Sequence, residues 1–237
     1  MTSPTHRPEK TALLVRGGWD GHQPEEATER FIPFLENRGY RIRVEESTSV
    51  YADADFMPTV DLIVQANTMN TIDPAELAGL IAAVRNGAGM GGWHGGIADS
   101  YRNSADYLHM IGGQFAHHAG IEPELRTGEQ SDYYLTHTIS IVPERSDHPI
   151  VTGLSDFELT TEQYWVLSDS YNDVLATTTV AARAFDAWQE SVVSPSVWTR
   201  RWGAGRIFVC TAGHRVEVLD NPHVRTIIER GLLWASR

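Results

Sequence analysis

The residue best placed to do chemistry in this sequence is His94, which stands in a run of glycines. The segment 89–96 reads GMGGWHGG. Glycines on both sides of one functional side chain, between a strand and a helix, are what a strained nucleophile-elbow turn requires, because only glycine tolerates such close neighbouring backbone. Histidine is not a usual acyl acceptor, but it suits metal ligation or acid–base work. We therefore predict a functional His94, with a histidine that only hydrogen-bonds its own loop as the alternative.

A largely parallel sheet, covered by helices on both faces, would position this turn. Apolar runs alternate with amphipathic stretches along the chain, which is the pattern of such a sheet. The carboxyl ends of its strands form the crevice where open α/β sheets bind ligands. The second half of the chain predicts an antiparallel extension with a hairpin around 202–205. We expect strands at 11–15, 40–44, 62–65, 87–92, 140–142, 157–159, 192–198 and 206–210, and helices at 24–37, from Asp73 onward, at 98–111 and at 222–235.

Length and composition favour one globular domain. The chain has 237 residues, of which 41% are hydrophobic and 21% charged, so we expect a single domain over 11–237 behind a loose polar tail at 1–10. The net charge of −12 argues against nucleic acid and anionic membranes as partners, because both attract clustered Lys and Arg. The single cysteine, Cys210, rules out an intrachain disulfide. No apolar run indicates a signal peptide or a membrane span, so we expect a cytoplasmic protein.

Several ordered segments resemble one known family, the trehalose-utilisation (ThuA-like) family. The segment 92–102, GWHGGIADSYR, is similar to the family's HGG-I-DS-[FY]-R signature. Further blocks with family-like patterns run from there to the end of the chain. They lie at 107–115 (YLHMIGGQF), 147–154 (DHPIVTGL), 161–164 (TEQY) and 205–214 (GRIFVCTAGH), and the chain closes on RGLLWA.

The resemblance implies a flavodoxin-like sheet of the class I glutamine-amidotransferase type. It also implies a role in the use of trehalose and related sugars, by way of 3-keto-glycosides in some bacteria. Amidotransferases of this fold use a cysteine at the elbow, where this chain has His94. The chemistry of an amidotransferase is therefore not expected here.

Glu162 and His214 are the residues that we expect to join His94. Amidotransferases of this fold place a His–Glu pair late in the chain, and both residues stand in late family-like blocks. Two histidines and a carboxylate are a common ligand set for Zn²⁺ or another divalent ion, with one position open for water. Such an ion polarises a carbonyl and lowers the pKa of its water. We predict His94, Glu162 and His214 as catalytic residues and metal ligands, with a metal-free polar cluster as the alternative.

Five further residues are candidates for holding a substrate. His22 follows the first predicted strand at the same edge of the sheet and could orient a substrate or join the ligand set. Arg102 suits a carboxylate or a sugar hydroxyl, Gln163 and Tyr164 offer groups for sugar recognition, and Trp93 suits stacking on a pyranose ring. Each also has a structural reading, as a loop residue, an ion pair or core packing.

The glycine pairs predict no nucleotide cofactor, because neither Gly17-Gly18 nor Gly112-Gly113 belongs to a dinucleotide fingerprint or a phosphate loop. A small-molecule carbohydrate is the expected partner, and a homo-oligomer is the expectation for this fold class.

Three functions remain open. The first is a metal-assisted enzyme on a sugar or keto-sugar, of hydrolase, lyase or isomerase type. The second is a non-catalytic module that binds or senses a sugar in the same crevice. The third is a hydrolase that uses Cys210, which would need a neighbouring base.

Overall fold

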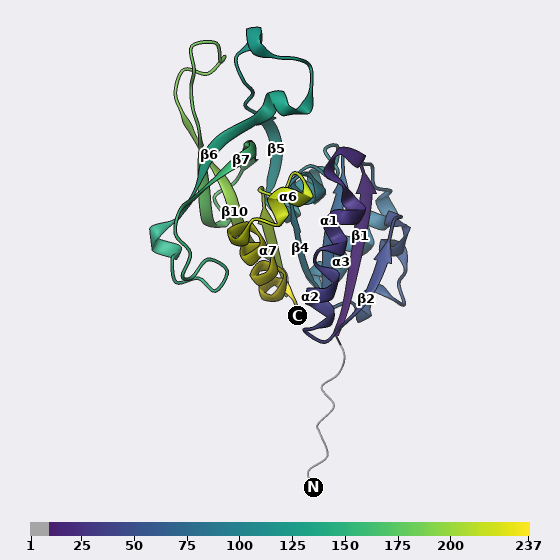
Figure 1. Ribbon diagram of the computed structural model, residues 1–237. Coiled ribbons are helices and arrows are strands. Elements are labelled where there is room, and N and C mark those ends of the chain that lie inside the picture. Colours follow the sequence, from purple (N-terminus) through teal and green to yellow (C-terminus); the bar gives the residue numbers. More distant parts are fainter. Residues whose placement is uncertain (1–9) are drawn as a thin grey trace.

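The computed structural model describes residues 10–237, and its first half is a parallel sheet (Figure 1). The strand β1 (Lys10–Gly18) lies between β2 (Tyr40–Glu45) and β3 (Leu62–Thr68), and β4 (Gly89–Trp93) follows β3. All of these neighbours pair in parallel. Residues 1–9 of the expected tail lie outside the described residues, and Lys10 is already part of β1 rather than of a tail.

The second half of the sheet is antiparallel, as the sequence predicted. β11 (Gly205–Cys210) pairs in parallel with β4. From β11 onward, through β10, β9, β6 and β7, each strand of the nine-stranded sheet pairs with the next in antiparallel orientation. A separate two-stranded sheet, β5–β8, lies beside it and was not predicted, and neither was β9. The strands of this half are β10 (Val192–Trp202), β9 (Asp173–Val180), β6 (Tyr134–Ile141), β7 (Phe157–Glu162), β5 (Gly113–His118) and β8 (Tyr164–Ser168).

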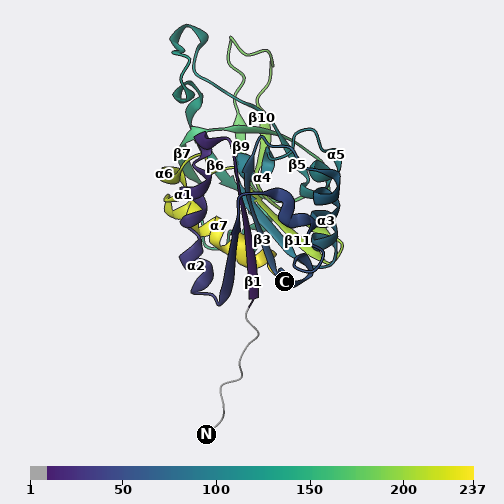
Figure 2. The same cartoon turned by 90° about the vertical axis from the view of Figure 1, so that its right-hand side faces the viewer.

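Helices cover both faces of the sheet (Figure 2). One face packs against α1 (Pro24–Glu29), α2 (Ile32–Glu36), α6 (Val216–Leu219) and α7 (Pro222–Ala235). The other packs against α3 (Pro74–Arg85), α4 (Gly95–Ala98) and α5 (Ala105–Ile111). Short 3-10 turns occupy Asp20–His22, Thr48–Ala52, Met57–Thr59, Pro123–Leu125, Gln130–Tyr133 and Pro143–Arg145.

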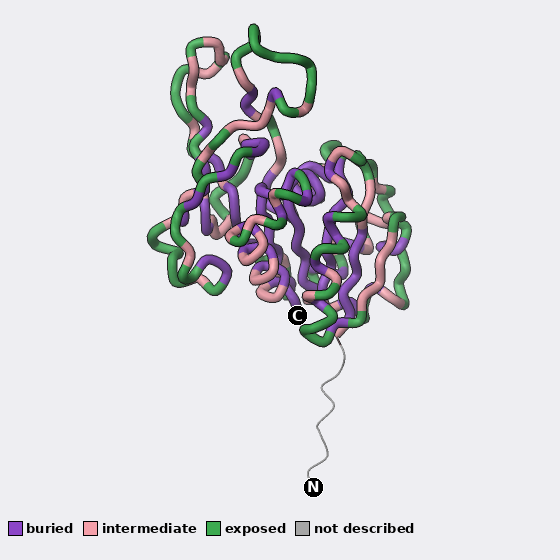
Figure 3. The backbone as a smooth tube through the Cα atoms, viewed as in Figure 1, coloured by how far each residue is buried: buried purple, intermediate pink, exposed green. Residues whose placement is uncertain are grey.

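Burial on both faces explains why the first strand reads as a continuous apolar run. Ala12 and Leu14 belong to the core beneath α1 and α7, whereas Leu13 and Val15 belong to the core beneath α3. Successive side chains of a strand point to opposite faces, so a strand buried on both sides needs apolar residues at every position. Figure 3 shows this burial concentrated in the central strands and the inner sides of the helices.

Two predicted helices are each divided in two. The predicted helix 24–37 breaks between α1 and α2, where Pro33 stands in the first turn of α2 and has no N–H to continue the bonding of α1. The predicted helix 98–111 breaks after α4, and Ser104 caps α5 by accepting a hydrogen bond from the Tyr107 N–H. Among residues 10–237, no helix combines the length and apolar character needed to span a bilayer.

Candidate functional site

His94 lies in a strained turn between β4 and α4. Its backbone dihedrals are φ 49° and ψ −141°, a combination that glycine adopts far more readily than other residues. The backbone N–H of His94 donates to the Cys210 carbonyl at 2.7 Å, which fixes the turn against the end of β11. A Cβ atom at Gly92 would lie 2.4 Å from the Gln65 carbonyl oxygen, and one at Gly96 would lie 2.9 Å from the Cα of Ala66. The glycines therefore permit β3 to approach the turn that presents His94.

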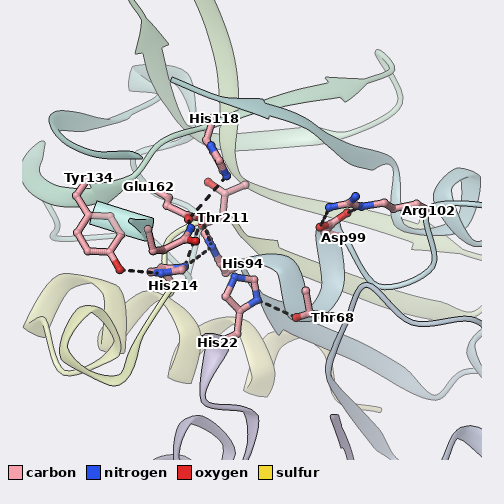
Figure 4. Close-up of polar contacts among 11 residues, drawn as sticks. His22, Thr68, His94, Asp99, Arg102, His118, Tyr134, Glu162, Thr211 and His214 are labelled. Carbon is pink, nitrogen blue, oxygen red and sulfur yellow. Dashed lines mark hydrogen bonds and ion pairs between the residues drawn. The ribbon is translucent and has the colours of Figure 1, made fainter. Parts of the chain in front are cut away.

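The side chains of His94, Glu162 and His214 converge on one point (Figure 4). Nε2 of His94 lies 3.0 Å from Oε2 of Glu162 and 3.2 Å from Nδ1 of His214, and that Nδ1 lies 3.3 Å from the same carboxylate oxygen. All three residues are almost fully buried. The structure thus brings together the three residues that the sequence predicted as a set, and we call them the His–Glu cluster.

This triangle of atoms has the dimensions of one face of a metal coordination shell. An ion about 2.1 Å from each ligand separates neighbouring ligand atoms by about 3.0 Å in octahedral and about 3.4 Å in tetrahedral geometry. The observed separations of 3.0, 3.2 and 3.3 Å fall within that interval. Two imidazoles and one carboxylate on a face, with further positions open, are a common set for divalent transition metals.

The hydrogen bonding of His94 also calls for a positive charge at this point. Its Nδ1 lies 2.7 Å from the Thr211 carbonyl oxygen, which can only accept, so Nδ1 carries a hydrogen. In the neutral ring Nε2 then holds a lone pair, and it faces a carboxylate oxygen that is also an acceptor. Either a proton on Nε2 or a bound cation resolves this conflict. The donor set of the His–Glu cluster therefore fits a divalent metal.

His22 is a fourth possible ligand. One ligand atom from each of His22, His94, Glu162 and His214 can be chosen so that all four lie within 4.8 Å of one another. Nδ1 of His22 lies 2.9 Å from the Thr68 hydroxyl, so Nε2 is the nitrogen left for a ligand. Burial lowers the pKa of His22 to about 2, and the neighbouring His94 and His214 add to the shift. His22 is therefore neutral at physiological pH, as a metal ligand must be.

The carboxylate of Glu162 is divided between two sets of partners. Oε2 faces the two histidines, whereas Oε1 accepts a hydrogen bond from Gln130 and lies 3.8 Å from Nε2 of His118. Burial alone would raise the pKa of Glu162, but the imidazoles of His214 and His94 beside it hold that pKa well below its usual value. Glu162 is therefore ionised, as a metal ligand requires.

The residues that support the cluster were not predicted from the sequence. The Tyr134 hydroxyl lies 3.0 Å from Nε2 of His214. Thr211 contacts the imidazole of His94, and Thr68 contacts that of the neighbouring His22. Burial lowers the pKa of His214, while its hydrogen bond with Glu162 opposes that shift. A carbonyl or hydroxyl partner on the second nitrogen of a ligand imidazole orients the ring. No motif marks such partners, because any residue at the right place can supply them.

Two of the predicted substrate-binding residues have structural contacts instead. The ring of Trp93 is 3% exposed and packs against Phe31 with centroids 4.7 Å apart, so it offers no open face to a sugar. Arg102 forms a two-pronged ion pair with Asp99, with Nη2 to Oδ2 at 2.7 Å, and the pair lies apart from the His–Glu cluster in Figure 4.

Tyr164 and Gln163 lie on opposite sides of the chain next to Glu162. The Tyr164 ring packs on the His94 imidazole, with centroids 4.1 Å apart. The Gln163 amide donates instead to the Thr178 hydroxyl and the Thr179 carbonyl, away from the His–Glu cluster. Tyr164 thus packs against the cluster, and Gln163 does not contact it.

The space beside the cluster is small. A cavity of about 10 Å³ is lined by residues that include His22, Thr68 and His94, which is room for about one water molecule or ion. Trp19 lies at the rim, 37% exposed, with its ring 4.8 Å from that of His22. A cavity of this size does not admit a sugar.

Cys210 does not have the environment of a nucleophile. It is buried at the end of β11, and burial raises its pKa to about 12. Its thiol donates to the Ala212 carbonyl at 3.5 Å. A cysteine nucleophile reacts as the thiolate, so the hydrolase reading that relies on Cys210 has no support in the structure.

Solved structures share this architecture. A ThuA-like protein from Bacteroides uniformis superposes with a TM-score of 0.73 at 16% identity, covering 99% of this chain and 94% of that one. A ThuA-like protein from Parabacteroides merdae gives 0.72 at 15% identity, with 95% and 89% covered. A cytoplasmic protein from Salmonella typhimurium gives 0.63 at 13% identity, with 96% and 100% covered. At these identities the likeness establishes the fold.

The sequence itself carries the family relationship. A search among curated proteins gave no match. The family described as trehalose utilisation, ThuA, matches residues 11–235, which is nearly the whole chain and includes all three residues of the His–Glu cluster. This chain therefore belongs to the trehalose utilisation (ThuA) family.

Proposed function

We propose that this protein is a metal-assisted enzyme of carbohydrate metabolism, acting on a sugar or keto-sugar. The observation that supports it most strongly is the triangle of His94 Nε2, Glu162 Oε2 and His214 Nδ1, whose sides of 3.0, 3.2 and 3.3 Å fit a divalent ion. Zn²⁺ is the first candidate, because two imidazoles and a carboxylate are a common zinc set. When bound, the ion polarises a carbonyl or hydroxyl of the substrate and lowers the pKa of a bound water.

The protein's own residues have separate roles in this proposal. His94, Glu162 and His214 hold the ion, and Thr211 and Tyr134 orient the two imidazoles through their outer nitrogens. His22 is neutral and lies on the open side, where it accepts a hydrogen bond from a substrate hydroxyl or completes the ligand set. The carbohydrate substrate is proposed from the family to which the chain belongs.

A second candidate is a sugar-binding module without turnover. The cavity of about 10 Å³ beside His94 favours it, since that space admits no sugar without a rearrangement. The absence of a cysteine at the elbow removes the chemistry that related folds perform there. Measured turnover of any sugar or keto-sugar would exclude this candidate.

Metal content tests the proposal directly. Protein purified without a metal-affinity tag is analysed for bound elements, before and after incubation with zinc, manganese, iron, cobalt and nickel. We expect about one divalent ion per chain in the wild type and a loss of it in His94→Ala and in His214→Ala. His109→Ala, in α5 and outside the cluster, is the matched control and retains the metal.

An absence of metal in the wild type after every reconstitution would overturn the metal-assisted proposal. The cluster would then be a charged hydrogen-bonded group, and the binding module would become the better reading. If the metal persists in both cluster variants, it is bound elsewhere and the ligand assignment is wrong.

A further inference from the structure

A second cavity, of about 470 Å³, lies where strands β6 and β9 separate. The two strands pair at Ser140–Thr177 and Ile141–Ala176. Beyond these positions β6 pairs with β7 and β9 with β10, so the sheet opens between them. None of the residues that line this cavity belongs to the His–Glu cluster.

Where β6 and β9 do not pair, side chains form hydrogen bonds with the strand backbone. Nδ1 of His137 donates to the Leu135 carbonyl at 2.9 Å. The Gln163 amide donates to the Thr179 carbonyl at 2.9 Å and to the Thr178 hydroxyl at 2.6 Å. A backbone carbonyl without a partner is costly, and these contacts satisfy two part-buried carbonyls where β6 and β9 do not pair. Hydrogen bonds therefore stabilise the wall of the cavity.

The lining is rich in hydroxyl groups and holds no carboxylate. Thr136, Thr138, Ser140 and Thr179 supply four hydroxyls, of which the Thr136 hydroxyl also pairs with the Thr160 hydroxyl at 2.8 Å. A hydroxyl can both donate and accept. The carbonyl partner of His137 Nδ1 leaves its Nε2 as an acceptor, and the two donated bonds of Gln163 leave its amide oxygen as another.

The cavity is also close to electrically neutral. Burial lowers the pKa of His137, so its ring is uncharged at physiological pH. The one cation in the lining, Arg183, is engaged in a two-pronged ion pair with Asp186 and donates to the Gly120 carbonyl. That contact joins the two loops that project at the top of Figure 1, the one after β5 and the one after β9. An anion or a cation would meet little complementary charge here.

We propose that this cavity binds a neutral polyhydroxylated molecule, a sugar or polyol, at a site separate from the His–Glu cluster. Alternating donors and acceptors on a neutral surface match the hydroxyls of such a ligand, and the volume lies within the usual range for small-molecule sites, about 300–1,000 Å³. The proposal does not require the cluster to hold a metal or to be catalytic.

The cavity and the cluster are neighbours at three places in the chain, where one residue contacts the cluster and the next residue lines the cavity. His118, Tyr134 and Glu162 contact the cluster or belong to it, and the residues that follow each of them, Ala119, Leu135 and Gln163, line the cavity. The two sites are therefore neighbours in the chain, but they share no side chain.

Calorimetric titration with neutral and charged probes tests the proposal. Glucose, trehalose and myo-inositol are titrated into the full chain, with glucose 6-phosphate as the charged probe. We expect at least one neutral probe to bind, and to bind more tightly than the phosphorylated sugar. Thr138→Val and Thr179→Val should each weaken it about fivefold, the effect of one lost hydrogen bond. Ala181→Phe, which fills the cavity from its rim, should weaken it at least tenfold.

Two controls separate this site from the cluster. Thr226→Val, on α7 and away from the cavity, should leave the affinity unchanged. His94→Ala should also leave it unchanged, even if it abolishes metal binding. Thermal melting checks that each variant is folded, and Ala181→Phe serves if a threonine variant is not.

Three results would overturn the proposal. The first is that none of the neutral probes binds the wild type. The second is that binding is lost in His94→Ala and kept in the cavity variants, which would place the sugar at the cluster. The third is tighter binding of glucose 6-phosphate, which would make the cavity an anion site. Each of these results leaves the metal test of the His–Glu cluster unaffected.

Discussion

Nε2 of His94 lies 3.0 Å from Oε2 of Glu162, although the two residues are 68 positions apart in the chain. One stands on a strained turn after a parallel strand, and the other ends a strand of the antiparallel extension. The contact therefore joins the two halves of the sheet. A third group, Nδ1 of His214, closes the triangle.

The backbone strain at His94 predicts an unusual order of stability. With φ at 49°, a Cβ atom is unfavourable there, so His94→Gly should unfold with a free energy about 1 kcal/mol higher than His94→Ala. Both variants lose the imidazole, so the pair isolates the backbone term. Urea unfolding measures the difference.

The matched pair of variants is His109→Gly and His109→Ala, inside α5. There the alanine variant should be the more stable one, by about 1 kcal/mol, because glycine is unfavourable in a helix interior. If His94→Ala were as stable as His94→Gly, the turn would not be strained.

The hydroxyl of Tyr134 should tune metal affinity. It lies 3.0 Å from the outer nitrogen of His214, and Tyr134→Phe removes that contact while keeping the ring. Loss of such a partner typically weakens metal binding 10–100-fold, so we expect at least a tenfold rise in the metal dissociation constant, measured by competition with a chelator. Tyr171→Phe, on an exposed ring, is the control and should bind as the wild type does. Equal affinities in all three proteins would remove Tyr134 from the site.

Acid should destabilise the metal-free protein, in part through His22. Its folded pKa is about 2 and its usual value is 6.5. Between these pH values the unfolded chain binds a proton that the folded chain does not, so this stability is complete above pH 6.5 and declines as the pH falls. The slope from one such group is about 1.4 kcal/mol per pH unit.

Glu162 acts in the same direction at lower pH. Its pKa in the folded chain lies below the usual 4.5, so its contribution is lost only as the pH falls below that value. Unfolding in urea with a chelator, from pH 8 to pH 5, therefore reports mainly on histidines. In His22→Gln the free energy of unfolding should change less steeply with pH than in the wild type, by about 1.4 kcal/mol per pH unit, the effect of one proton. Identical slopes in the two proteins would contradict a neutral buried His22.

Cys210 should be chemically silent in the folded protein. Burial raises its pKa to about 12, so the thiolate is scarce at neutral pH and the sulfur is covered. Iodoacetamide should leave the native chain unmodified over hours and label it fully in urea, as mass spectrometry can show. Rapid labelling of the native chain would restore the thiol as a candidate nucleophile.

The sequence determined the features that depend on local chain geometry. The glycines around His94 predicted a tight turn, because that conformation tolerates few other residues. The helix expected from Asp73 onward begins as α3 with Asp73 as its cap, and the hairpin around 202–205 and the helix 222–235 lie where they were expected. The two helix breaks, at Pro33 and at Ser104, were not predicted and are known only from the structure.

The His–Glu cluster was expected from the sequence, but only the tertiary structure decided which other polar residues lie beside it. Glu162 and Gln163 are adjacent and both suit a sugar or metal site, yet one faces the His–Glu cluster and the other faces the second cavity. The register of β7 against β6, which sets Glu162 opposite Tyr134, fixes that choice. Gln163 directly follows the last residue of β7, and adjacent residues of an extended chain point to opposite sides, so a shift of one residue would exchange Glu162 and Gln163. Register depends on packing across the whole sheet, which no short stretch of sequence contains.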